Sequence, residues 1–463
     1  MIMSAYQPVT PEIIAMLQAA VGADAVTTAS AELQLHAKDQ SHHPAHLADV
    51  LIYPTSAGQV SSVLKIAHEH CIPVTAWGVG TGLEGSAIPV FGGISISFEK
   101  MNQIVKIYAD DFQATVQPGI GHKDLNAILA RQGLFFAPDP GANASVGGML
   151  ANNASGIRTV KYGASKDNVL KMQVALADGT LIDVGSRSVK QSSGYDLLHL
   201  FVGSEGTLGI ITEATLKLVP VPSLMSAVVA AFETVEAAVE TVVAVRGSGL
   251  DPAALELIDA AHCHMLRETE GVDLSDHPTL FMEFHAAHAA TLQAGLEAVE
   301  AICQEMGALS FRATTDPTER TKLWHARHHS YEIMVRSHPN HHFFIMDVAV
   351  PISAYPALIG YVEQLKRETG VIAYMIGHAG DGNIHVEFPF ADESEYRRCM
   401  GLNGLIIEKA LELGGTITGE HGVGIGKAIY MAKEHGPALA VMRAIKQTLD
   451  PKGILNPGKL FVG

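Results

Sequence analysis

Cysteine and positive charge are both scarce in this chain of 463 residues. The cysteines are Cys71, Cys263, Cys303 and Cys399, and they form no C-x-x-C or C-x-x-C-H pattern. Their spacing argues against an iron–sulfur cluster, covalent haem and the disulfide framework of a secreted protein. Lysine and arginine number 31 against 48 aspartate and glutamate residues, for a formal net charge of −17. Such a surface repels phosphate backbones, so no nucleic-acid partner is expected.

A membrane-spanning run and a targeting segment are also missing from the sequence. The N-terminal residues MIMSAYQP include no basic region followed by an apolar one. Charged residues interrupt the apolar stretch at 227–245, which makes it unsuited to spanning a membrane. We expect a cytoplasmic protein, and peripheral attachment at the inner membrane stays open because an electron acceptor can itself sit in a membrane.

The first half of the chain alternates short β-rich runs with helical spacing of apolar residues, which predicts a mixed α+β domain. The expected strands lie at 50–54, 72–77, 93–98, 114–117 and 210–218, and the expected helices at 56–70 and 122–131. Pro220 and Pro222 punctuate the end of this region. We therefore place a domain boundary near residue 222.

The second half predicts another α+β unit, which we interpret as a substrate-covering domain. Helices are expected at 227–246, 290–306 and 317–336, and strands at 279–285, 343–350, 371–376 and 384–389. The tail from Leu402 is expected to be helical and to end in turns. The predicted domains are 1–222, 223–415, and a C-terminal segment 416–463 that completes the site and packs back on the first domain.

Glycine is plentiful, and three loops concentrate it. Residues 80–85 match G-x-G-x-x-G after an expected strand, but Pro89 follows too soon for the crossover helix of a dinucleotide-binding βαβ unit. We interpret this loop as a backbone nest for a pyrophosphate, with an ordinary glycine turn as the alternative. Further loops at 138–163 and 203–210 are rich in small residues, which allow a planar ligand to lie against the main chain.

Together these loops resemble the FAD-binding domain shared by vanillyl-alcohol oxidase and the FAD-linked D-lactate dehydrogenases, from about residue 49 to the C-terminus. The resemblance implies an α+β fold, with an FAD-binding domain of two α/β subdomains and an α+β cap domain with an antiparallel sheet. FAD is expected without a covalent bond, because residues 79–83 lack the histidine of covalent members. The implied FAD-binding residues are Gly78, Gly80, Thr81, Gly82, Leu83, Pro138, Asp139, Gly141, Ala144, Ser145, Gly147, Gly148, Asn152, Ser155, Gly156, Glu205, Gly209, Ile210 and Asn456.

The resemblance also implies which part of FAD each group of residues binds. Residues 78–83 are expected to hold the pyrophosphate, and 138–156 to lie along the flavin and its phosphates. Glu205 and Ile210 are expected to reach the ribityl or adenine side.

Two histidine motifs in the second half predict a catalytic metal site. In GHAGDGNIH the Asp381–Gly382 pair favours a tight turn that brings His378 and His385 together. The later motif GEHG supplies Glu420. Two imidazoles and a carboxylate with an open fourth position suit a catalytic divalent cation, zinc or manganese.

His421 is the candidate general base, because an imidazole titrates near neutral pH and can remove a hydroxyl proton. Structural histidines remain the alternative, and the pairs at 42–43, 328–329 and 341–342 are interpreted as surface or packing residues. The two motifs together are similar to the C-terminal domain of the D-2-hydroxy-acid dehydrogenases, which favours function for 378, 385, 420 and 421.

Substrate recognition is expected to rest on Arg327 and Ile345. The segment LWHAR resembles the L-W-x-x-R of the same family, which implies that Arg327 binds the substrate carboxylate, while an exposed helix arginine is the alternative. Relatives acting on D-2-hydroxyglutarate carry a lysine where this chain has Ile345. An apolar side chain leaves a second carboxylate unpaired, so a small or apolar monocarboxylate is expected.

The resulting hypothesis is FAD-dependent oxidation of a D-2-hydroxy acid, most of all D-lactate, with hydride transfer to flavin N5. The electrons pass to an external acceptor, which is a quinone, a cytochrome or an electron-transfer flavoprotein; a homodimer is compatible. The FAD subunit of a glycolate oxidase and a D-2-hydroxyglutarate dehydrogenase are alternatives. A metal-dependent hydrolase and a flavin carrier without its own substrate are alternatives of other classes.

Overall fold

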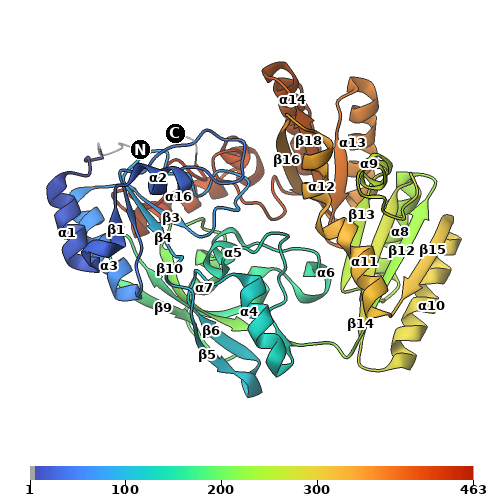
Figure 1. The fold of residues 1–463 in the computed structure, drawn as a ribbon, viewed down its shortest axis with the longest axis horizontal. Coiled ribbons are helices and arrows are strands. Elements are labelled where there is room, and N and C mark those ends of the chain that lie inside the picture. The colour runs from blue at the N-terminus through green and yellow to red at the C-terminus, as the bar shows by residue number, and fades with distance from the viewer. Residues whose placement is uncertain (1–5, 462–463) are drawn as a thin grey trace. The chain divides into compact units, whose positions relative to one another are not determined.

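The computed structural model describes residues 6–461, which form two compact units (Figure 1). Unit 1 holds the chain up to Ser155, 163–221, and the chain from Glu420 onward. Unit 2 holds Gly156–Tyr162 and Pro222–Gly419. The chain thus passes between the two units after Val221 and after Gly419, where the sequence placed the boundaries at 222 and 415. The sequence did not predict that the short segment Gly156–Tyr162 belongs to unit 2. No helix within residues 6–461 is long and apolar enough to cross a membrane.

Unit 1 is built on two main sheets. The four-stranded sheet has the order β1-β2-β4-β3, in which β2, β4 and β3 run parallel. The five-stranded sheet has the order β5-β6-β10-β8-β9 and is antiparallel. The strands are β1 (Val26–Thr27), β2 (Val50–Ile52), β3 (Val74–Trp77), β4 (Ile94–Ser97), β5 (Ile104–Tyr108), β6 (Gln113–Val116), β8 (Val169–Ala175), β9 (Leu181–Gly185) and β10 (Ile210–Lys217), and a small pair joins β7 (Leu134–Phe135) to β11 (Val219–Pro220).

Helices of unit 1 cover these sheets and bury two separate apolar cores. One core gathers around β2, β3, β4 and their helices, and the other around β6, β8 and β10. The helices are α1 (Pro11–Val21), α2 (Ser30–Leu35), α3 (Ala57–His70), α4 (His122–Leu129), α5 (Val146–Asn152), α7 (Leu197–Phe201), α15 (Met431–His435) and α16 (Ala438–Leu449). Helix α3 begins where Ser56 caps the amide of Gln59, as its sequence pattern predicts.

The C-terminal segment is part of unit 1 rather than an appended tail. Ile454 and Leu455 are fully buried in the core of the first sheet, and Leu455 bridges Val74 of β3. The ammonium of Lys446 donates to the carbonyls of Thr207 at 2.7 Å and Leu455 at 2.9 Å. The final residues therefore close the β3 edge of the sheet from which the first glycine loop leaves.

Unit 2 contains one seven-stranded sheet with the order β15-β12-β14-β13-β17-β18-β16, antiparallel at every pairing. Its strands are β12 (Leu224–Phe232), β13 (Ala254–Ile258), β14 (Thr279–Ala286), β15 (Ala308–Thr314), β16 (His342–Ala349), β17 (Tyr374–Gly377) and β18 (Asn383–Phe390). Its helices are α6 (Thr159–Tyr162), α8 (Val235–Gly247), α9 (Ala260–Glu270), α10 (Ala289–Glu305), α11 (Pro317–His328), α12 (Ser330–Ser337), α13 (Tyr355–Thr369) and α14 (Glu393–Glu412).

One face of this sheet carries the polar groups discussed below. Residues alternate between faces along a strand, and the pairing registers place Glu256, Glu283, His285, Asp347, His385 and Glu387 on the same face. The apolar residues of that face pack against α9, α11 and α12 in one core. Helices α8, α10 and α14 contact the sheet as well, and α8 also packs on α10 and α13.

Three expectations about helices are corrected by the structure. The stretch 227–246 is not one helix, because its first part is strand β12 and helix α8 begins only after Thr234 caps Ala237. A central strand buried on both faces is apolar throughout, so periodicity does not separate it from a buried helix. The helix expected at 317–336 is broken at His329 into α11 and α12. The helix expected from Leu402 begins earlier, at Glu393, and ends at Glu412.

Candidate active site

The first glycine loop in unit 1 has no crossover helix, as the sequence predicted; its interpretation as a nest for a pyrophosphate stays a prediction. No helix lies between β3 and β4, and Gly80 adopts a left-handed conformation with φ of +69°. A Cβ on Gly78 would meet Oγ of Ser145 at 2.3 Å, so the first and second glycine loops lie directly against each other. Thr81, Gly82 and Leu83 follow in the same partly exposed turn.

The second loop runs into helix α5. Pro138, Asp139, Gly141 and Ala144 lie in its irregular part, while Ser145 precedes the helix that holds Gly147, Gly148 and Asn152. A Cβ on Gly147 would meet Cβ of Pro118 at 2.5 Å, so this glycine allows close packing. Gly209 and Ile210 are of another kind: a Cβ on Gly209 would meet Val174 at 2.5 Å, and Ile210 is buried in the core.

Glu205 holds the loop that carries the GEHG motif. Its carboxylate accepts hydrogen bonds from the amides of Val423 at 2.6 Å and Gly424 at 2.8 Å, and from the Ser86 hydroxyl at 2.7 Å. Asn456 donates to the Glu205 carbonyl at 2.7 Å. Burial raises the pKa of Glu205, and these hydrogen bonds together with the positive charge of Lys459 offset it only in part. The structure therefore shows Glu205 and Asn456 as loop anchors, a role that the sequence did not indicate.

Two residues of the second glycine loop bind the GEHG motif within unit 1. The Ser155 hydroxyl donates to the Glu420 carboxylate at 2.6 Å, and the Asn152 amide donates to the His421 carbonyl at 3.2 Å. Hence the loop predicted to lie along the flavin also fixes the candidate metal ligand and the candidate base. Gly156, the next predicted residue, already belongs to unit 2.

In unit 2 the DG turn brings the two predicted histidine ligands together, which confirms that expectation. Strands β17 and β18 form a hairpin, and Gly382 in its turn has φ of +72°. The rings of His378 and His385 are 5.3 Å apart and nearly perpendicular. A nitrogen of each ring lies within 4.8 Å of one from the other, a spacing that one cation can bridge.

A fully buried glutamate joins the predicted arginine to the first histidine. Glu256 on β13 accepts from Nδ1 of His378 at 2.9 Å and from Nε of Arg327 at 2.9 Å. Burial works to raise the pKa of Glu256, but the charges of His378 and Arg327 outweigh it and lower this pKa. Arg327 is 8% exposed, so it is not the exposed helix arginine that was the alternative. Sequence reasoning missed Glu256, which looks like one more residue of a strand.

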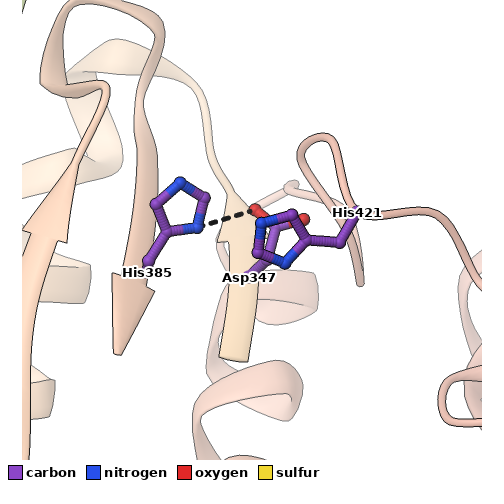
Figure 2. Close-up of side chains that lie close together, drawn as sticks. All are labelled: Asp347, His385 and His421. Carbon is purple, nitrogen blue, oxygen red and sulfur yellow. Dashed lines mark ion pairs between the residues drawn. The ribbon is translucent and has the colours of Figure 1, made fainter. Parts of the chain in front are cut away.

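His385 lies beside a second buried carboxylate. Its Nδ1 is 3.6 Å from Oδ1 of Asp347 on β16, an ion pair if the imidazole is protonated (Figure 2). Asp347 also accepts from the Asn383 amide at 2.6 Å and from the Thr418 hydroxyl at 2.8 Å. These bonds fix the end of unit 2, and Glu420 follows Thr418 by two residues along the chain.

A separate charged network lies on the same sheet face. Glu283 accepts from Nε of Arg158 at 3.1 Å and from Nε2 of His285 at 2.6 Å, while the Tyr162 hydroxyl lies 2.7 Å from Nδ1 of His285. Burial opposes ionisation of Glu283, but the bond from His285 and the charge of Arg158 lower its pKa to about 2. This network holds the segment Gly156–Tyr162 on unit 2.

Glu387 on β18 contrasts with both carboxylates. It is 4% exposed, and burial raises its pKa to about 8 against the positive charge of Arg327. Its Oε2 has no hydrogen-bond partner among residues 6–461. Of the histidine pairs expected to be surface or packing residues, His328 has a packing role. Its ring stacks on that of Trp324 with centroids 5.6 Å apart, and burial lowers its pKa to about 4.

Nearly the whole chain is similar to known proteins. Residues 48–185 match the FAD binding domain family, and residues 221–460 match the family "FAD linked oxidases, C-terminal domain". A probable mitochondrial D-lactate dehydrogenase from Danio rerio is 37% identical, covering 99% of this chain and 93% of that protein. A mitochondrial D-lactate dehydrogenase (cytochrome) from Arabidopsis thaliana is 36% identical, covering 98% and 81%. The glycolate oxidase subunit GlcD from Bacillus subtilis is also 36% identical, covering 90% and 89%.

Solved structures share the fold at low sequence identity. The 4-ethylphenol oxidase from Gulosibacter chungangensis superposes with a TM-score of 0.80 at 17% identity, covering 100% of this chain and 99% of that one. p-Cresol methylhydroxylase gives a TM-score of 0.79 at 18% identity, covering 97% and 96%. These likenesses confirm the expected α+β fold of the vanillyl-alcohol oxidase type.

Proposed function

Because the chain belongs to the family of FAD-linked oxidases that includes the D-lactate dehydrogenases, we propose that it oxidises a D-2-hydroxy acid to the 2-oxo acid. D-Lactate is the leading substrate, since several relatives carry that name. Bound FAD would supply the acceptor for the hydride that leaves C2 of the substrate. A hydrolase would have no use for the FAD-binding domain, so that alternative is set aside.

The observation that carries this proposal is the Glu256 bridge between Arg327 and His378. A 2-hydroxy acid presents a carboxylate and a hydroxyl on neighbouring carbons, so its site needs a fixed cation close to a group that binds the hydroxyl. Glu256 occupies one edge of the guanidinium, whose other N–H groups suit a substrate carboxylate. The Glu256 carboxylate also orients the imidazole of His378, a proposed ligand of the cation that would bind the substrate hydroxyl.

The histidine pair fits a divalent cation. An ionised Glu256 accepts the proton of His378 Nδ1, which leaves Nε2 of that ring as the lone-pair nitrogen that a metal requires. His378, His385 and Glu420 are the proposed ligands, and zinc or manganese is the proposed ion. A bound cation would polarise the substrate hydroxyl and stabilise the developing alkoxide.

The glycine loops fit a dinucleotide. A side chain at Gly78 would collide with the Ser145 hydroxyl of the second loop, and Gly80 adopts the left-handed conformation that an anion-binding turn uses. Residues 78–83 would hold the pyrophosphate, and 138–156 would lie along the flavin. No residue in 79–83 offers a histidine for a covalent bond, so FAD is proposed to be non-covalent.

His421 is the proposed general base. It takes the hydroxyl proton as the hydride leaves C2, so that two electrons and one proton depart in separate directions. Glu205 and Asn152 hold the loop that carries His421, which restricts the positions that its imidazole can adopt. The electrons would then pass to an external quinone, cytochrome or electron-transfer flavoprotein. The protein is proposed to be cytoplasmic, either free or attached peripherally at the inner membrane.

The test is the visible spectrum of the purified holoenzyme before and after anaerobic addition of single substrates. D-Lactate is expected to bleach the flavin band, while L-lactate leaves it unchanged. Bleaching by glycolate alone would favour the role of the GlcD relatives, and bleaching by D-2-hydroxyglutarate alone would refute the interpretation of Ile345. A protein without a flavin spectrum would refute the FAD assignment.

A further inference from the structure

One oxygen of the buried Glu387 carboxyl has no hydrogen-bond partner among residues 6–461. The side chain is 4% exposed, and the unpaired atom is Oε2. Leaving a buried polar atom unpaired is costly, and a leucine of similar size would avoid that cost. The unpaired oxygen is therefore suited to a hydrogen bond with a ligand.

The pairing register places this carboxyl beside the histidine pair. Glu387 lies two residues after His385 on β18, so both side chains point to the same face, about 7 Å apart along the strand. Across the sheet Glu387 pairs with Ile345 on β16 and Tyr374 on β17. Ile345 was interpreted as an apolar wall, but the residue directly opposite it is a carboxyl.

We propose that Glu387 is a specificity-determining residue that hydrogen-bonds a polar group, above all a hydroxyl, on C3 of the 2-hydroxy acid. The proposal rests on the proposed function, in which His378 and His385 serve the C2 hydroxyl. A C3 substituent that extends along β18 reaches the position of Glu387, while Ile345 offers it no hydrogen bond. Among 2-hydroxy acids longer than D-lactate, those with a hydroxyl on C3 are therefore favoured over those with an alkyl group there.

The experiment uses two substrates that differ in a single group. D-Glycerate carries a hydroxyl where D-2-hydroxybutyrate carries a methyl group, and both have the same number of heavy atoms. The ratio of their kcat/KM values is measured by anaerobic flavin reduction in the holoenzyme. Wild type is expected to favour D-glycerate by roughly 10-fold or more, because the methyl group of D-2-hydroxybutyrate leaves the Glu387 oxygen unpaired.

Two variants assign the preference to this side chain. Glu387→Leu is expected to abolish or invert the ratio, while Glu387→Gln, which keeps a hydrogen-bonding group, retains most of it. Glu297→Leu on the exposed face of α10 is the matched control and is expected to leave the ratio unchanged. A thermal melt of Glu387→Leu no lower than that of wild type separates lost preference from misfolding.

The outcomes distinguish this inference from the proposed function. If D-lactate bleaches the wild-type flavin but kcat/KM is the same for D-glycerate and D-2-hydroxybutyrate, the proposed role of Glu387 is overturned. An ordered water would then be the partner of its unpaired oxygen. An unchanged ratio in Glu387→Leu would overturn it as well. A flavoprotein that no 2-hydroxy acid bleaches would instead refute the proposed function.

Discussion

The two units prepare for ligands in different ways. Unit 1 offers main chain: glycines at 78 and 147 let loops approach one another, and Gly80 takes a left-handed turn. Unit 2 offers side chains: carboxylates on the strands of one sheet hold arginine and histidine in fixed positions. The difference agrees with the proposed ligands, since a dinucleotide needs a long, close fit whereas a small acid needs a few directed charges.

Two fully buried glutamates show the same contrast in one residue type. Glu205 in unit 1 meets backbone amides and a hydroxyl, and burial raises its pKa. Glu256 in unit 2 meets Arg327 and His378, whose charges overcome the effect of burial and lower its pKa. Both groups are buried, so the difference in the direction of the pKa shift comes from their neighbours: Glu205 serves as an anchor and Glu256 as a counter-ion.

The strongest test of this contrast is Glu256→Gln. The change removes the negative charge that pairs with Arg327 and accepts the Nδ1 proton of His378, so kcat/KM for D-lactate is expected to fall by about 100-fold or more, with loss of bound metal. The rate of anaerobic flavin reduction and the metal content of the purified variant are the measurements. Glu297→Gln on exposed α10 is the control. A fully active, fully metallated Glu256→Gln would show that the bridge does not orient the site.

Arg327→Lys sharpens the comparison within the bridge. Lysine keeps the positive charge but lacks the planar fork that binds Glu256 on one edge and a carboxylate on another. KM for D-lactate is expected to rise by roughly 10-fold or more, while bound FAD is unchanged, because FAD is assigned to unit 1. Steady-state kinetics with an artificial acceptor gives KM, and the visible spectrum gives FAD content. An unchanged KM would remove Arg327 from substrate binding.

Glu205→Gln applies the same chemical change to the anchor. An amide keeps one acceptor oxygen, but its NH₂ group then meets an amide that formerly donated to the carboxylate. Thermal and chemical unfolding are expected to show a loss of about 1–3 kcal/mol. The rate of flavin reduction should fall by much less than in Glu256→Gln. An effect on rate as large as that of Glu256→Gln would contradict the distinction between anchor and counter-ion.

The sequence predicted the local features of the site well. The turn at Gly382 brings His378 and His385 together, and the loop from Gly80 has no crossover helix, because tight turns depend on neighbouring residues. Strand Leu224–Phe232 was mistaken for a helix because a central strand buried on both faces has no alternation to show.

The partners of the site residues were beyond sequence reasoning. Glu256 reaches Arg327 across 71 positions and His378 across 122, and only the order of strands in the sheet brings them together. Likewise Ile345 suggested an apolar pocket until the register set Glu387 opposite it. Pairing across a sheet depends on the whole fold, which no local pattern encodes.

The smallest expected effect concerns Glu283, the third buried carboxylate of the contrast. Its pKa falls from an ordinary 4.5 to about 2 in the folded state, so its stabilising contribution is full above the unfolded value and fades as pH falls. Between about pH 7 and about pH 4, wild type is expected to lose about 1 kcal/mol through this group. Glu283→Gln is less stable at neutral pH and lacks this share of the acid loss. Urea unfolding of both proteins at the two pH values measures the difference, and parallel losses would mean that Arg158 and His285 do not hold Glu283 ionised.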